Sequence, residues 1–186
     1  MQLDLHIAKA VRILRNGGVI AYPTEAVFGL GCMPDDASAV ARLLEIKQRS
    51  WRKGLLLIAA DIEQVEAWAF LPDGELGRTV AESWPGPVTW ALPARERVPP
   101  WISGGRGTVA MRVTDHPVAR ALCRRAGTPL VSTSANIGGR PPIRRLLVLR
   151  RQLGRAVDYI VPGALGDRQR PSLIRDAESG RILRTG

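Results

Sequence analysis

The stretch Val19-Ile20-Ala21-Tyr22-Pro23-Thr24-Glu25-Ala26-Val27-Phe28-Gly29-Leu30-Gly31 combines the two features from which the expected fold follows, a buried strand and a polar loop directly after it. The apolar run Val19–Tyr22 predicts the strand, and Pro23 stops it because proline has no N–H to donate to a sheet. From Tyr22 to Gly31 the loop offers a hydroxyl, a carboxylate and glycines that let the backbone approach a ligand. Alone, this loop fits an ordinary turn as well as it fits a binding site.

Apolar runs and capping residues predict the other elements on both sides of this stretch. We expect helices over residues 3–15, from a cap at Asp35 or Asp36 to Lys47, after Asp61, after Asp115-His116-Pro117, and from about residue 143 to 153. We expect strands over residues 19–22, 55–59, 88–92, 108–113 and 129–132, with shorter ones over 158–161, 172–175 and 181–184. Because the strands do not alternate strictly with helices, the expected fold class is α/β with a twisted mixed β-sheet and helices packed around it.

Length and composition predict an ordinary globular protein. The 186 residues are expected to form one domain, residues 1–186, and the hydrophobic content of 45% suffices for a core. No segment approaches the roughly 18 apolar residues of a membrane span, and Met1 to His6 lack the basic start and apolar core of a secretory signal. Cys32 and Cys123 form no CxxC pair, so neither a disulfide framework nor a zinc site is indicated. A cytoplasmic protein without membrane association is expected.

The charge balance points to a polyanionic partner. The formal net charge is +10, and a basic surface attracts polyanions, of which nucleic acid is the commonest in a cytoplasm. We therefore expect contact with tRNA or other RNA, although an arginine-rich composition is also produced by coding bias. The aromatic content of 5% argues against a platform that stacks single-stranded bases.

Lysine is rare in this chain, and its placement is informative. Only three of the 27 cationic residues are lysines, and two of them lie in the short stretch Lys47-Gln48-Arg49-Ser50-Trp51-Arg52-Lys53. A lysine ammonium is a compact point charge, which suits a cation that must fit against a phosphate. The cluster predicts an anion-handling site, although four cations in seven residues also fit a solvated helix end that the helix dipole favours.

A further polar loop, Ser132-Thr133-Ser134-Ala135-Asn136-Ile137-Gly138-Gly139, follows the strand expected over residues 129–132. Its hydroxyl and amide groups suit hydrogen bonds to phosphate or ribose, with a polar turn as the alternative. The GxxxxGK[ST] and GxGxxG motifs of the two standard nucleotide folds are missing. His6 and His116 fit structural roles, no serine or cysteine has a credible histidine partner, and the carboxylates lack metal-ligand spacing.

Taken together, these motifs resemble the YrdC domain family of threonylcarbamoyl-AMP synthases. The resemblance rests on stretches that occur in the family's order and cover nearly the whole chain: Tyr22–Glu25 with Phe28–Gly31, Lys47-Gln48-Arg49 with Lys53, Trp84-Pro85-Gly86-Pro87, Val109–Val113, Ser132–Asn136 and Pro171-Ser172. Each stretch is weak alone, but the set is specific. The length and the ending Arg184-Thr185-Gly186 are similar to the short bacterial form, which lacks the extra C-terminal domain of the long form.

The resemblance implies an enzyme, a nucleotidyltransferase that makes L-threonylcarbamoyladenylate and pyrophosphate from L-threonine, bicarbonate and ATP. The product serves the N6-threonylcarbamoyladenosine modification of tRNA next to the anticodon, and partner proteins of a transfer complex complete that step. The implied fold is a twisted mixed sheet with surrounding helices and a basic concave surface. ATP is a substrate, Mg²⁺ would arrive with the nucleotide, and neither a prosthetic group nor a protein-held metal is implied.

Site residues follow from motif position. The resemblance assigns L-threonine to Thr24, Arg112, Ser132 and Ser172, with the planar fork of Arg112 suited to clamping a carboxylate through two charge-assisted bonds. It assigns catalysis to Lys47, Arg49 and Lys53. ATP would be bound by Lys47, Arg49, Lys53, Thr108, Ser134, Asn136 and Arg184.

Three departures from the family pattern leave details open. Ser50 stands where the family usually has proline, which predicts a less rigid loop, and Gly138-Gly139 replaces a Ser-Gly pair. The segment from Ile143 to Arg151 is unusually basic, and its role is not indicated.

Two other functions remain as alternatives. One is an RNA-binding module without catalysis, which the charge favours because binding through shape and phosphates needs no base-reading aromatics. The other is a related carbamoyl-adenylate chemistry with another carbamoyl source, as in hydrogenase-maturation proteins, although those chains carry additional domains.

Overall fold

One mixed β-sheet organises the molecule. The computed structural model describes residues 2–169 and 172–185, and in this part of the chain nine strands pair in the order β7-β1-β2-β6-β3-β5-β4-β8-β9. Pairs β1–β7, β3–β5 and β4–β8 are parallel and the other five are antiparallel. The strands are β1 (Ile20–Pro23), β2 (Phe28–Gly31), β3 (Leu56–Ala59), β4 (Val88–Pro93), β5 (Thr108–Val113), β6 (Leu130–Ser134), β7 (Tyr159–Ile160), β8 (Leu173–Asp176) and β9 (Ile182–Arg184). The expected mixed sheet is confirmed.

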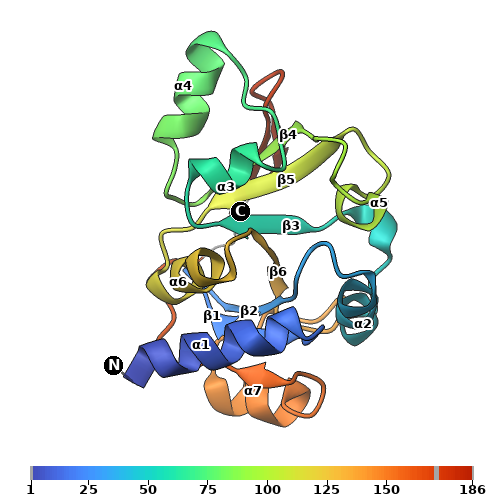
Figure 1. Ribbon diagram of the computed structural model, residues 1–186, viewed down its shortest axis with the longest axis vertical. Helices are drawn as coiled ribbons and strands as arrows, with labels where there is room; N and C mark the ends of the chain where they lie inside the picture. Colours follow the sequence, from blue (N-terminus) through green and yellow to red (C-terminus); the bar gives the residue numbers. More distant parts are fainter. Residues whose placement is uncertain (1, 170–171, 186) are drawn as a thin grey trace.

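Helices surround this sheet (Figure 1). They are α1 (Gln2–Arg15), α2 (Ala37–Lys47), α3 (Ile62–Glu66), α4 (Gly74–Glu82), α5 (Pro100–Ser103), α6 (Pro117–Ala126) and α7 (Leu146–Leu153), with a short 3-10 helix η1 at Trp51–Lys53. Two predicted caps are in place, since Asp36 accepts from the Ala39 N–H at 2.9 Å and Asp61 from the Gln64 N–H at 3.0 Å. No helix in the described part of the chain is long and apolar enough to cross a membrane.

The two faces of the sheet have different roles. Because side chains alternate across a strand, Val109, Met111 and Val113 of β5 are buried in the larger hydrophobic core, which includes residues of α2, α3 and α7. On the opposite face, Thr108, Ala110 and Arg112 line a pocket.

The pocket shares its face of the sheet with a second hydrophobic core. There α1 and α6 lie side by side and bury Ile20, Ile58 and Leu130 of β1, β3 and β6 (Figure 1). Two residues after Leu130 on the same face, Ser132 lines the pocket. The pocket is therefore the part of this face that α1 and α6 leave uncovered.

Three local expectations differ from the structure. Residues 28–31, read as part of a ligand loop, form strand β2 between β1 and β6. Helix α4 was not expected, and it buries only Val80, so its apolar signal is weak. Helix α7 begins at residue 146 rather than 143, because Ile143 is held by backbone bonds to Phe28 (3.0 Å) and Ala135 (3.2 Å).

Candidate active site

A single pocket of about 740 Å³ brings together every site residue that the sequence motifs indicate. Its walls come from segments far apart in the chain: the loop after β1, the end of α2, η1, strands β5 and β6, and the strands β8 and β9 near the end of the chain. The predicted residues that line it are Thr24, Lys47, Arg49, Lys53, Thr108, Arg112, Ser132, Ser134, Asn136, Ser172 and Arg184. Pro171, which belongs to one of the motifs, lies outside the described residues.

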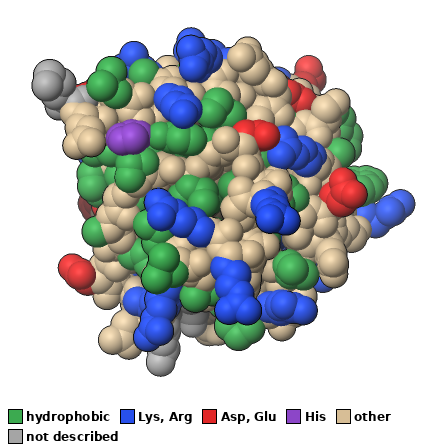
Figure 2. All heavy atoms as spheres, turned by 90° about the horizontal axis from the view of Figure 1, so that it is seen from below, with side chains coloured by type: hydrophobic (Ala, Val, Ile, Leu, Met, Phe, Trp, Pro, Cys, Tyr) green, Lys and Arg blue, Asp and Glu red, His purple; other side chains and the backbone are tan. Residues whose placement is uncertain are grey.

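The pocket is strongly cationic. Among the described residues its lining includes seven lysine and arginine side chains but only two acidic ones, Glu25 and Asp176. Positive charges that line one concave surface focus their field on it and favour an anionic ligand. Basic side chains are also scattered over the outside of the molecule, as Figure 2 shows for the face seen from below.

Lys47 organises one wall of the pocket. Its side chain is buried at the end of α2, and its ammonium donates to the Ser134 carbonyl (2.5 Å) and to the Asn136 carbonyl (2.9 Å) and Oδ1 (3.1 Å). The Ser134 hydroxyl donates to the same Oδ1 at 2.6 Å. An ammonium has three hydrogens, so the loop takes them all, and Lys47 reaches a phosphate only by exchanging one of these partners. Burial, followed by the nearby charge of Arg49, lowers the pKa of Lys47 to about 8.

The residues around Lys47 shape the same wall. Gln48 adopts the left-handed conformation that ends α2 (φ 50°), and the Gly138 N–H donates to the Lys47 carbonyl at 2.8 Å. A Cβ added at Gly138 would lie 3.0 Å from that carbonyl, so the glycine that departs from the family pattern fits closely here. Ser50, the other departure, accepts from the Arg52 N–H at 3.3 Å and thereby caps η1, which carries Lys53.

Arg49 and Arg184 form a pair of like charges. Arg49 Nη2 donates to the Gly54 carbonyl (3.1 Å) and Arg184 Nη2 to the Ser172 carbonyl (3.2 Å). Burial lowers the pKa of both guanidinium groups, and the charge of Arg184 lowers that of Arg49 further. The buried Arg49 Nε has no hydrogen-bond partner among the described residues. Two partly desolvated guanidiniums with donors to spare, one half-buried and one exposed, are features of a site for a polyvalent anion.

Hydroxyl groups line another part of the pocket wall, in which Ser172 lies next to Arg184. Thr24 and Ser132 are buried, and the Thr24 hydroxyl donates to the Val27 carbonyl at 2.6 Å. Ser172 accepts from the Thr89 hydroxyl at 2.9 Å. Small hydroxyls beside a guanidinium suit a short polar ligand such as an amino acid.

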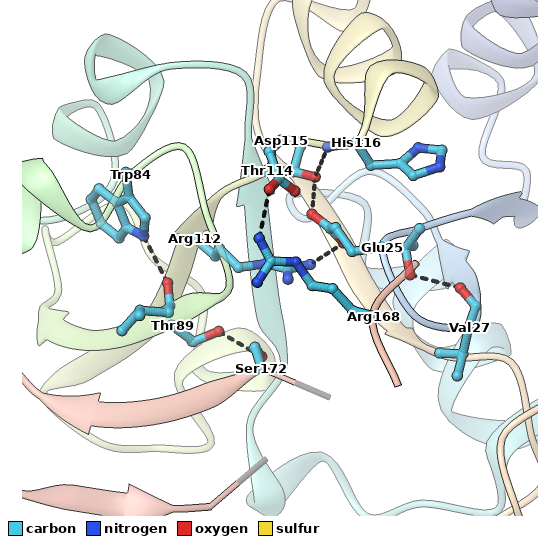
Figure 3. Close-up of polar contacts among 12 residues, drawn as sticks. Glu25, Val27, Trp84, Thr89, Arg112, Thr114, Asp115, His116, Arg168 and Ser172 are labelled. Carbon is cyan, nitrogen blue, oxygen red and sulfur yellow. Dashed lines mark hydrogen bonds and ion pairs between the residues drawn. The ribbon is translucent and has the colours of Figure 1, made fainter. Parts of the chain in front are cut away.

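Arg112 forms an ion pair that the sequence motifs did not indicate. Its Nη2 donates to Glu25 Oε2 at 3.0 Å, and the Thr114 hydroxyl donates to Glu25 Oε1 at 2.5 Å (Figure 3). Both side chains of the ion pair are buried, with exposed fractions of 8% and 6%. A second, more exposed pair joins Arg168 to Asp115 at 2.8 Å. Glu25 was noted as a carboxylate of the first loop, but no spacing pattern links it to residues 87 and 89 positions later.

His6 and His116 serve the fold. The ring of His6 contacts the Tyr159 hydroxyl at 2.5 Å, outside the pocket. His116 is buried, and its Nε2 lies 3.1 Å from the Ala164 carbonyl. This agrees with the structural roles expected for both residues.

Relatives match the chain over nearly all of its length. A protein named threonylcarbamoyl-AMP synthase from Halorhodospira halophila (strain DSM 244 / SL1) is 53% identical over 178 residues, which cover 96% of this chain and 93% of the relative. A protein of the same name from Nitrosococcus oceani is 53% identical over 175 residues, covering 94% and 95%.

A solved structure shows that the similarity includes the fold, and a sequence family matches most of the chain. The crystal structure of P. abyssi Sua5 complexed with L-threonine aligns with a TM-score of 0.88 and 33% identity, over 96% of this chain. It covers 53% of that protein, so this chain spans about half the length of the Sua5 chain. The sequence family described as "Telomere recombination" (Sua5_yciO_yrdC) matches residues 12–186. With pocket, fold and relatives in agreement, this chain belongs to the Sua5/YciO/YrdC family.

Proposed function

We propose that this chain is a threonylcarbamoyl-AMP synthase, which makes L-threonylcarbamoyladenylate and pyrophosphate from L-threonine, bicarbonate and ATP. The observation that carries the proposal is the convergence of eleven motif residues on one pocket that has a cationic wall and a hydroxyl-lined wall. Relatives that are 53% identical have the name of this enzyme.

The cationic wall would bind ATP. Arg49 and Arg184 bring two partly desolvated guanidiniums together, so a triphosphate between them would relieve their repulsion. Lys53, on η1, adds a compact charge, and Thr108 adds a hydroxyl at the start of β5. Lys47 would act mainly through the loop that presents Ser134 and Asn136.

The hydroxyl-lined wall would bind L-threonine. Arg112 would clamp the α-carboxylate with donors that Glu25 leaves free, and Thr24, Ser132 and Ser172 would contact the polar groups of the amino acid. The family neighbour P. abyssi Sua5 was crystallised with L-threonine, which supports an amino-acid site on this fold.

The chemistry needs no protein nucleophile. The threonine amine adds to CO₂ derived from bicarbonate, and the resulting carbamate attacks the α-phosphorus of ATP and expels pyrophosphate. Holding the two substrates in line and stabilising negative charge are then the enzyme's main tasks, which cationic and hydroxyl side chains perform. Mg²⁺ would come with the nucleotide, and the reaction requires no prosthetic group.

The product would be used in tRNA modification. We expect transfer to N6 of the adenosine next to the anticodon to be completed by partner proteins in the cytoplasm, with tRNA contacting the basic surface of this chain. Binding of RNA is compatible with catalysis, because most of the charge lies outside the pocket: the chain has 27 cationic residues and seven line it.

The test is pyrophosphate release from ATP by the purified full chain. L-threonine and bicarbonate are each added or withheld, and D-threonine replaces L-threonine as a control for the handedness of the site. Release that requires both L-threonine and bicarbonate supports the synthase. Release without threonine, or none at all, contradicts it.

The alternatives predict other results. A non-catalytic RNA-binding module would give no release but tight, salt-sensitive RNA binding. A synthase with another carbamoyl source would release pyrophosphate with carbamoyl phosphate in place of bicarbonate. Near-complete overlap with the relatives named threonylcarbamoyl-AMP synthase favours that enzyme over a synthase with another carbamoyl source.

A further inference from the structure

We propose that Glu25 is a positioning residue for the amino-acid substrate, which fixes the guanidinium of Arg112 so that its remaining donors face the substrate carboxylate. This inference rests on the proposed function and adds a residue that the motifs did not assign to the site. Glu25 would not touch the reacting atoms.

The Glu25 carboxylate accepts from two strand-end residues and also lies beside the Asp115 carboxylate. Oε2 accepts from Arg112 Nη2 (3.0 Å) and Oε1 accepts from the Thr114 hydroxyl (2.5 Å), as Figure 3 shows. Thr114 in turn accepts from the His116 N–H at 3.2 Å, so its hydroxyl is fixed at both ends. The carboxylate is thus oriented before any ligand arrives, and it orients one edge of the guanidinium.

This arrangement leaves part of Arg112 free. A guanidinium has five N–H donors, and the hydrogen bond to Glu25 uses one nitrogen of Arg112. Its buried Nε has no hydrogen-bond partner among the described residues, although buried polar groups are nearly always satisfied. Arg112 lines the pocket and has donors that no contact among the described residues uses, so it can bind an acceptor on a ligand there.

The fold of the loop does not depend on the Glu25 side chain. The Glu25 carbonyl accepts from the Arg168 N–H (3.0 Å), and the Thr24 carbonyl accepts from the Gly166 N–H (3.0 Å). These main-chain bonds hold the loop irrespective of the side chain at position 25. The carboxylate therefore has a task besides anchoring its own loop, and both of its oxygens are used on residues of the Arg112 strand and its continuation.

The test is Glu25→Gln, which keeps the size of the side chain and one acceptor but removes the charge. We expect the threonine KM to rise at least about tenfold, because a charge-assisted bond that orients Arg112 is lost. The ATP KM and kcat should stay within about threefold of wild type, whereas the melting temperature should fall, because glutamine leaves the buried charge of Arg112 without a counter-charge. A threonine KM that is unchanged or lower would overturn the proposal, since a carboxylate that merely competes for Arg112 gives that result.

Two further variants make the result decisive. Thr114→Val removes the second contact of Glu25 at nearly constant volume, and it should shift the threonine KM in the same direction but less. Asp158→Asn is the matched control, because Asp158 pairs with Arg42 at 2.6 Å away from the pocket and should leave both KM values unchanged. If Glu25→Gln fails to fold, an unchanged threonine KM in Thr114→Val overturns the proposal. If the wild type itself shows no threonine-dependent release, the proposed function has failed instead.

Discussion

The ammonium of Lys47 is fully bonded within the protein. All three of its ammonium hydrogens have acceptors on residues 134 and 136, so the charge that the sequence motif assigns to phosphate binding is already used by the protein. We infer that its contribution to ATP binding is the shape of that loop.

A pH profile tests this role of Lys47. With a pKa near 8, Lys47 loses one donor at higher pH and the loop loses one bond, so kcat/KM for ATP at saturating threonine should fall between about pH 7 and 9. In Arg49→Gln the fall should move to higher pH, because burial still lowers the pKa but the like charge is gone. If kcat/KM falls at the same pH in wild type and in Arg49→Gln, the titration of Lys47 is not its cause.

Protein stability changes in the opposite direction over this pH range. The folded pKa lies below the unfolded value of about 10.4, so between about pH 8 and 10 the unfolded chain binds more protons and this group makes stability rise with pH. Melting temperatures measured over the same pH range therefore show whether the fall in activity comes from loss of the loop bond or from unfolding. Lys47→Ala, which we expect to lose about a hundredfold in rate, should lack the alkaline fall altogether.

Arg112→Lys tests the carboxylate clamp. A lysine keeps the charge but cannot make two parallel bonds to a carboxylate, so the threonine KM should rise about tenfold or more while the ATP KM is unchanged. Steady-state kinetics with each substrate varied in turn measures both. Arg42→Lys, at an ion pair outside the pocket, is the control. Equal increases in both KM values would contradict a threonine-specific role.

Among single residues, the motifs indicated which side chains line the pocket, but not which distant side chains form ion pairs and hydrogen bonds with one another. The eleven residues that the resemblance assigns to the site all line the pocket, and their roles stay predictions, whereas the ion pairs and hydrogen bonds of Thr114, Asp115 and Arg168 were not anticipated. Their partners lie 53 to 89 positions away, and local spacing contains no information about which distant side chains meet.

Strand β2 shows the limits of prediction at the scale of elements. The predicted helices and most strands are confirmed within a few residues, because apolar periodicity and caps such as Asp36 and Asp61 mark them. In β2, glycines replace every second side chain, which hides the strand in the sequence. Packing explains them, since a Cβ at Gly31 would lie 2.6 Å from the Val131 carbonyl and 2.8 Å from the Tyr22 ring.

Gly31→Ala should therefore destabilise the protein. The added methyl meets backbone on one side and a buried ring on the other, so we expect a loss of at least about 2 kcal/mol in the free energy of unfolding and a fall of roughly 4–8 °C in melting temperature. Gly107→Ala is the matched control, because a Cβ there meets nothing within 4 Å. Equal melting temperatures for the two variants would refute the packing explanation.

Across the whole molecule, most cationic side chains lie outside the pocket. Helix α7 and the residues before it carry Arg144, Arg145, Arg150 and Arg151, all exposed and outside the pocket lining. That the whole chain, residues 1–186, forms one domain stays a prediction, as does RNA contact through this basic surface.

Salt dependence tests the RNA contact. If the basic surface neutralises phosphates, affinity for tRNA should fall at least about tenfold between 50 and 200 mM salt, because condensed counterions are released on binding. The double variant Arg150→Ala/Arg151→Ala should weaken binding and flatten this dependence without changing pyrophosphate release. Arg124→Ala/Arg125→Ala on α6 is the matched pair of exposed arginines. Equal losses from both pairs would mean that the charge acts diffusely rather than at α7.

The opposite roles of the two faces of β5, one buried in the larger core and one lining the pocket, have a consequence for how this chain can vary. Side chains on β5 alternate between core and ligand, so removing or inserting one residue there would exchange Arg112 for a hydrophobic neighbour and bury its charge. A chain that pairs these strands wrongly loses its hydrophobic interior and its substrate site together. Selection for folding alone would therefore remove most variants in which a shift of β5 misaligns the pocket residues.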